Sequence, residues 1–92
     1  MKEIEQALVR YVNRLDASAA RTTQANDRPS YTQHLAAAAR MFASLHSNAP
    51  LATLKSLVAD EREAYGRFFL TSDAGKAAEA AFDEFAKQVE AA

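Results

Sequence analysis

The sequence predicts an all-α protein, a small antiparallel four-helix bundle, and three observations support this fold class. Two glycines and two prolines in 92 residues are too few for the tight turns of an all-β chain. Alanine is the commonest residue, and it favours helix because its side chain loses no conformational freedom there. Four segments carry their large apolar residues at helical spacing. One hydrophobic core suits this length, so we expect a single helical domain over residues 1–92.

The first helix is predicted from residue 2 to about residue 17. Its apolar face consists of Ile4, Leu8, Tyr11, Val12 and Leu15. The helix ends between Asp16 and Ala25, because alanines that favour helix are followed there by residues that prefer turns and caps.

The second helix is predicted over residues 30–47. Ser30 begins it, because Ser30 and Gln33 have the spacing of a capping box, in which each side chain satisfies a backbone N–H at the helix start. Pro50 follows the end of this segment and cannot continue a helix. The apolar face consists of Tyr31, Leu35, Ala38, Phe42 and Leu45, with Met41 at one edge.

The third helix is predicted over residues 50–70, with Pro50 in its first turn. Its apolar face is wide and consists of Leu51, Leu54, Leu57, Val58, Ala64, Tyr65, Phe68 and Phe69. One neighbouring helix would not cover a face of this width. We therefore expect this helix to contact two others and to be the one against which the others pack.

The fourth helix is predicted over residues 73–91, with Ser72 or Asp73 as its N-cap. Asp83 and Lys87 have the i,i+4 spacing of a helical ion pair. The connections at 48–50 and 71–72 are very short, so consecutive helices must be antiparallel. An up-down-up-down bundle follows. The alternative is a three-helix bundle of the last three helices with the first helix lying across it.

Composition and charge exclude several classes of function. The chain has no cysteine, which excludes disulfides, thiolate metal sites and cysteine nucleophiles. A net charge of -1 provides no global attraction to nucleic acid or anionic lipid. Charged residues interrupt the apolar runs, so neither a secretory signal nor a membrane span is predicted. We expect a cytoplasmic protein without a cofactor.

Glu61 is the most unusual residue, because it falls in the middle of the apolar face of the third helix. One interpretation makes it a general acid or base, or a metal ligand, in the bundle interior. The other places it over a gap between helices, where its carboxylate reaches solvent or an arginine. Arg14 and Arg40 are candidate partners. The sequence leaves open whether Glu61 is buried or paired.

Both histidines lie on the second helix. His34 and His46 are twelve residues apart, roughly 18 Å along the helix axis, so they cannot bind one metal ion together. The E-x-x-H spacing of di-metal bundles is absent. A histidine at the boundary of an apolar face is typical of a half-buried packing residue, and we expect this of His34. A metal site built from Glu61 and His34 has no motif to support it, so no metal site is predicted.

Arg40 is the only charged residue of the second helix apart from the histidines. Met41 and several small residues lie beside the central apolar stripe and give this helix a smooth surface that a second chain could cover. Arg40 and Met41 are therefore candidate binding residues, with Glu61 and His34 as the candidates in the interior. The partner would be another protein or a second copy in a homodimer.

No motif of a known enzyme or nucleotide-binding site is present. The leading hypothesis is a non-enzymatic protein–protein interaction or regulatory protein that binds through a helix face. The alternative is a ligand- or metal-binding bundle, or a small enzyme, that uses Glu61. Nucleic-acid binding through a stripe of Arg10, Arg14 and Arg21 is disfavoured, because the net charge is slightly negative.

Overall fold

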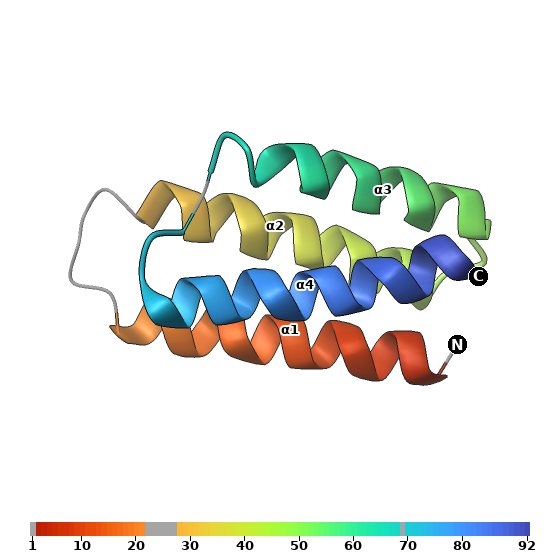
Figure 1. Ribbon diagram of the computed structural model, residues 1–92. Helices are drawn as coiled ribbons and strands as arrows, with labels where there is room; N and C mark the ends of the chain where they lie inside the picture. The colour runs from red at the N-terminus through yellow and green to blue at the C-terminus, as the bar shows by residue number, and fades with distance from the viewer. Residues whose placement is uncertain (1, 22–27, 69) are drawn as a thin grey trace.

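The structure, a computed structural model of the 92-residue chain, describes residues 2–21, 28–68 and 70–92. Its helices are α1 (Lys2–Arg21), α2 (Arg28–Leu45), α3 (Leu51–Ala64) and α4 (Asp73–Ala91). Consecutive helices run in opposite directions (Figure 1). The predicted all-α, up-down-up-down bundle is therefore confirmed, and α1 ends within the predicted interval. Phe69, which we assigned to the apolar face of the third helix, lies outside the described residues.

The four helices form a square in cross-section. α1 contacts α2 and α4, and α3 contacts the same two helices, so α1 and α3 lie on one diagonal. α3 contacts two neighbours, as predicted. The prediction that the others pack mainly against it is wrong, because the most extensive contact joins α1 and α4. With 14 residues against 20 and 19, α3 is much shorter than α1 and α4 and offers less surface.

The start of α2 differs from the prediction by two residues. The helix begins at Arg28, so Ser30 lies within its first turn and is not the N-cap. Pro29 is compatible with this start, because the first-turn N–H groups have no partner within a helix and a proline there loses no hydrogen bond.

The end of α3 differs more. The helix ends at Ala64 and not at Leu70, and the following residues form tightened turns. The backbone N–H of Gly66 donates to the carbonyl of Glu63 at 3.0 Å, and that of Arg67 donates to the carbonyl of Ala64 at 2.9 Å. Glycine is unfavourable in a helix interior, so Gly66 is a natural place for the helix to end.

The start of α4 agrees with the prediction, because the helix begins at Asp73. The Ser72 side chain accepts a hydrogen bond from the backbone N–H of Gly75 at 3.0 Å, which makes Ser72 the N-cap. Lys87 and Asp83 form the predicted ion pair at 3.0 Å. Gly75 also has a steric role, because a Cβ atom there would lie only 2.5 Å from the Cβ atom of Leu70. The segment that precedes α4 therefore packs closely against the first turn of α4 at Gly75.

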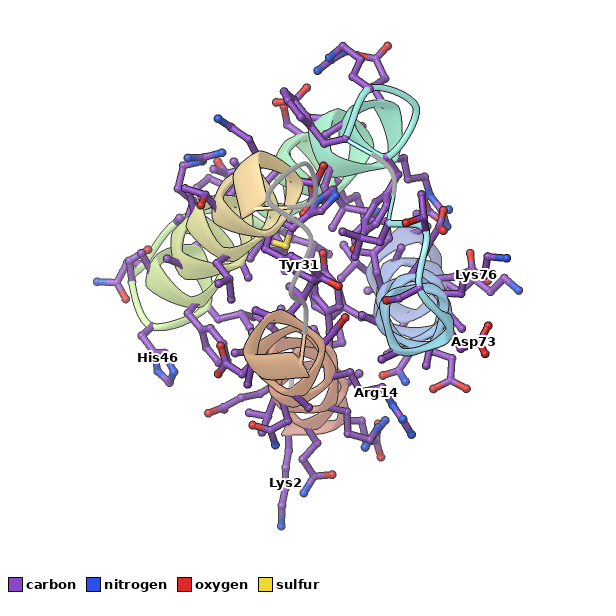
Figure 2. The ribbon with its side chains drawn as sticks, turned by 90° about the vertical axis from the view of Figure 1, so that its left-hand side faces the viewer. Lys2, Arg14, Tyr31, His46, Asp73 and Lys76 are labelled. Carbon is purple, nitrogen blue, oxygen red and sulfur yellow. The ribbon has the colours of Figure 1, made fainter. Side chains whose placement is uncertain are left out.

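The core is built from apolar side chains of all four helices. Its large members are Ile4, Leu8, Tyr11, Leu15, Tyr31, Met41, Leu54, Val58, Tyr65, Leu70, Phe82, Phe85 and Val89. Figure 2 shows Tyr31 pointing into this interior. None of the helices in the described ranges is long and apolar enough to cross a membrane.

The buried face of α2 is rotated from the predicted stripe. Met41 and His34 are fully buried, whereas Leu35 and Phe42 are only partly buried. The placement of Met41 on a surface open to another chain is therefore wrong, and so is the half-buried position expected of His34. The physical reason is that α2 packs between α1 and α3, which buries a wider face than one neighbour would.

Candidate functional site

Glu61 lies in the bundle interior, with 2% of its surface exposed. Its Oε2 atom accepts a hydrogen bond of 3.1 Å from the Tyr11 hydroxyl, and its Oε1 atom lies 3.1 Å from Nδ1 of His34. The question that the sequence left open is thus answered: Glu61 is buried and paired. Its partners are Tyr11 and His34 and not the arginines that we considered, Arg14 and Arg40.

The Tyr11 hydroxyl also lies 2.6 Å from the Tyr65 hydroxyl. Because the single proton of Tyr11 is directed at Glu61, Tyr65 must donate to Tyr11. The His34 ring stacks on the Tyr65 ring, with centroids 3.9 Å apart and planes inclined by 15°. Phe82 of α4 packs against both tyrosines at 5.3 Å. The hydrogen-bonded network of Glu61 and the rings packed on it therefore involve side chains from all four helices or their adjoining turns.

His34 and Glu61 share one proton. Nε2 of His34 lies 2.5 Å from the backbone carbonyl oxygen of Phe68, and a carbonyl can only accept, so Nε2 carries a hydrogen. A hydrogen bond between Nδ1 and Oε1 then requires one further proton. The pair is either an imidazolium with a carboxylate or a neutral imidazole with a carboxylic acid. Both forms have no net charge, which is the arrangement that burial favours.

Burial raises the pKa of the Tyr11 hydroxyl far above its ordinary value, and the neighbouring Tyr65 and Glu61 raise it further. Burial likewise raises the pKa of Tyr65. Both tyrosines are therefore neutral hydrogen-bond donors wherever the protein is folded near neutral pH. The chain of donors runs from Tyr65 through Tyr11 to Glu61.

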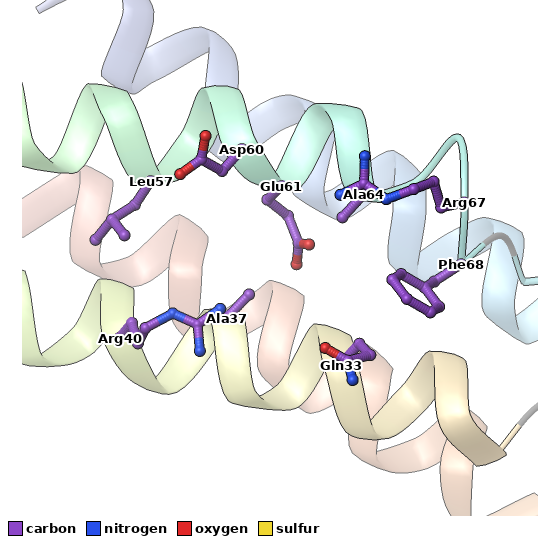
Figure 3. Close-up of a pocket in the computed structure, with 9 residues that line it drawn as sticks. All are labelled: Gln33, Ala37, Arg40, Leu57, Asp60, Glu61, Ala64, Arg67 and Phe68. Carbon is purple, nitrogen blue, oxygen red and sulfur yellow. The ribbon is translucent and has the colours of Figure 1, made fainter.

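A groove of about 160 Å³ lies between α2 and α3, and Glu61 lines it. Figure 3 shows the Glu61 side chain directed from α3 into the space between the two helices. The other lining residues are Gln33, Ala37 and Arg40 of α2, Leu57, Asp60 and Ala64 of α3, and Arg67 and Phe68 of the turn that follows α3. His34 holds one end of this groove in place, because its Nε2–H binds the carbonyl of Phe68.

Arg40 and Arg67 are both exposed, and they lie on opposite walls of this groove (Figure 3). Neither guanidinium has an ion-pair partner in the part of the chain that the structure describes. Arg62 is different, because it binds Glu90 at 2.7 Å and Asp83 at 3.2 Å and so joins α3 to α4. The groove therefore presents two positive charges that are available to a ligand, together with the exposed carboxylate of Asp60 on the α3 wall.

The structure brings together three of the four candidate residues. Glu61, His34 and Arg40 belong to the network or its groove, whereas Met41 is a core residue. The sequence reading missed the hydroxyls of Tyr11 and Tyr65. A signal was present, because buried tyrosine hydroxyls require partners and Glu61 is an acceptor on the same predicted apolar face as Tyr65.

The arginine stripe of α1 lies elsewhere. Arg10 and Arg14 line a separate groove between α1 and α4, and the side chain of Arg21 lies outside the described part of the structure.

Within the described ranges, no three side chains of histidine, cysteine, aspartate or glutamate cluster as metal ligands. No protein-family model, curated protein or solved structure matches this chain.

Proposed function

We propose that this protein is a non-enzymatic binding protein that docks an acidic segment of a partner protein in the groove between α2 and α3. The observation that carries the proposal is the placement of Arg40 and Arg67, two arginines without ion-pair partners in the described chain, on opposite walls of one groove. Guanidinium groups bind carboxylates with two parallel hydrogen bonds and good geometry.

The surface between the two arginines supports a protein partner. Ala37, Leu57 and Phe68 line the groove and are each at least partly buried, so it combines apolar contact area with charge at its rim. A segment that carries carboxylates beside apolar side chains would satisfy both features. The volume of about 160 Å³ suits a few such side chains and is smaller than pockets of roughly 300–1,000 Å³ that hold drug-sized ligands.

The chemistry of the interior favours binding over catalysis. Both oxygens of Glu61 and both ring nitrogens of His34 have partners within the chain. A general acid or base exchanges its proton with a substrate, and here such an exchange would break a buried hydrogen bond. The network therefore supports the walls of the groove. The second candidate, a small-ligand site, rests on the single observation that Glu61 lines the groove.

The test compares three immobilised proteins in an extract of the source cells: the natural chain, an Arg40→Glu/Arg67→Glu variant and a Lys76→Glu variant. Lys76 is an exposed cation of α4, on the diagonal opposite α2 (Figure 2), so its reversal controls for the effect of a charge reversal outside the groove. A partner retained by the natural chain and by Lys76→Glu is then titrated calorimetrically. We expect the double variant to bind it at least tenfold more weakly.

Two results would oppose the proposal. One is equal binding of the partner by the double variant. The other is the absence of any protein retained specifically by the natural chain. Circular dichroism of each variant is the control for folding. We expect it to show intact helices, because the substituted positions are exposed.

A further inference from the structure

A second groove, of about 230 Å³, lies between α1 and α4. The α1–α4 pair forms the edge of the square opposite the α2–α3 pair, so the two grooves open on opposite sides of the bundle. Arg10 and Arg14 of α1 form one wall of the second groove, and Glu84 of α4 lies on the other wall. Its remaining lining residues are Ala77, Ala80 and Ala81. Figure 2 shows Arg14 on the edge of α1 that faces α4.

The two walls carry opposite charges that are not used within the chain. Arg10, Arg14 and Glu84 are all exposed. None of these three side chains has an ion-pair partner among the described residues, although they line one groove. Between them lie only alanines, so a helix of another molecule can approach closely.

We propose that this face binds a second copy of the chain and that α1 and α4 form a two-fold interface. A two-fold axis parallel to the helices places α1 of one copy over α4 of the other. The rotation leaves the position of each residue along the axis unchanged. Arg10, Arg14 and Glu84 line the same groove and hence lie at similar heights. The basic wall of each copy therefore meets Glu84 of its partner, and the symmetry makes this contact twice.

Charge complementarity favours a second copy over a nucleic acid. A polyanion would meet Glu84 inside the groove, whereas a copy of the chain meets it with arginine. The helix directions are compatible with this interface. α1 and α4 are antiparallel within the chain, and the two-fold axis also makes α1 of one copy antiparallel to α4 of the other. This interface is independent of the α2–α3 groove, so both surfaces can be occupied together.

Sedimentation equilibrium over a wide concentration range tests the proposal. The natural chain is expected at twice its mass of 10.0 kDa. In the proposed dimer, residue 14 of each copy faces residue 84 of the other. Arg14→Glu and Glu84→Arg each bring like charges together at both of these contacts, so each variant is expected to weaken self-association at least tenfold. An equimolar mixture of these two variants restores complementarity, and so does the Arg14→Glu/Glu84→Arg chain. Recovery of the dimer in both samples would support the two-fold arrangement specifically.

The matched control is Glu79→Arg, an exposed charge reversal on the edge of α4 that faces α3. It is expected to leave the dimer unchanged. A mass of one chain at every concentration would overturn the proposal. A dimer that all three single variants weaken equally, or that the mixture does not restore, would also overturn it. A monomer that binds duplex DNA at low salt would assign the arginines to nucleic acid.

Discussion

Tyr11 of α1 and Glu61 of α3 are joined by a hydrogen bond of 3.1 Å across the diagonal of the bundle. The helices that carry them share no backbone contact in the described structure, so they are bridged through their side chains. A buried polar network stabilises one arrangement only when each member has a partner, and here each does. The network therefore specifies how α3 is rotated against its neighbours, which sets the wall of the groove.

Replacing Glu61 tests this network directly. Glu61→Ala leaves Nδ1 of His34 without a buried partner and removes the acceptor of the Tyr11 proton, so we expect a loss of roughly 3–5 kcal/mol in the free energy of unfolding. Glu61→Gln should cost less than half as much. Its amide oxygen can accept from Tyr11, and its amide nitrogen can donate to Nδ1 of a neutral His34. Urea denaturation measures both changes.

Glu63→Ala is the control for these variants, because Glu63 is an exposed residue of the same helix. Its effect on stability should stay within about 0.5 kcal/mol. If Glu61→Ala and Glu63→Ala destabilised the protein equally, Glu61 would not be paired in the interior.

The raised pKa values of Tyr11 and Tyr65 predict a loss of stability at alkaline pH. In the unfolded chain both hydroxyls ionise near pH 10, whereas burial keeps them neutral in the folded protein. Their contribution is thus fully present below about pH 10 and is lost as the pH rises above it. Each tyrosine should lower stability by about 1.4 kcal/mol per pH unit in that range.

Tyr65→Phe isolates this effect. The variant removes one ionising group and keeps the bond from Tyr11 to Glu61, so its stability should fall less steeply above pH 10 than that of the natural protein. Absorbance at the tyrosinate band, recorded with the unfolding curves, should show Tyr11 and Tyr65 ionising only on unfolding. Ionisation of all tyrosines in the folded state near pH 10 would disagree with the buried network.

The ion pairs of Arg62 predict a smaller loss of stability at acidic pH. Hydrogen bonds from Lys87 and Arg62 lower the pKa of Asp83, and hydrogen bonds from Arg62 lower the pKa of Glu90. The stability from these carboxylates is present above their ordinary pKa values and is lost as the pH falls through the lowered ones. Arg62→Gln should flatten this part of the stability profile, and added salt should reduce the difference, because the groups are exposed.

Gly75 predicts a steric effect at the start of α4. Gly75→Ala would place a Cβ atom 2.5 Å from the Cβ atom of Leu70, so one of the two segments must move. We expect a destabilisation of about 1–3 kcal/mol in thermal or urea unfolding. Gly66→Ala is the matched control, since its new Cβ would meet only the carbonyl oxygen of Glu63, at 3.2 Å. Equal stability of the two variants would contradict the close approach of Leu70.

The sequence was sufficient for the fold class, the order and direction of the helices and the unusual position of Glu61. Helical spacing places Glu61 on an apolar face whatever the rest of the chain does. Its partners were out of reach, because Tyr11 and His34 precede it by 50 and 27 residues. A helical wheel does not fix how one helix is rotated against the next. That rotation buries His34 and Met41 in α2, which the stripe of large apolar residues did not indicate.

The most direct test of the central claim is an NMR map of the ¹⁵N-labelled chain with the partner that it retains from the extract. We expect the largest shifts at Arg40 and Arg67, including their side-chain Nε–H signals, and at Ala37 and Leu57 between them. Arg10 and Arg14, which line the other groove, should change little. Shifts confined to α1 and α4, or spread evenly over the exposed arginines, would contradict docking between α2 and α3.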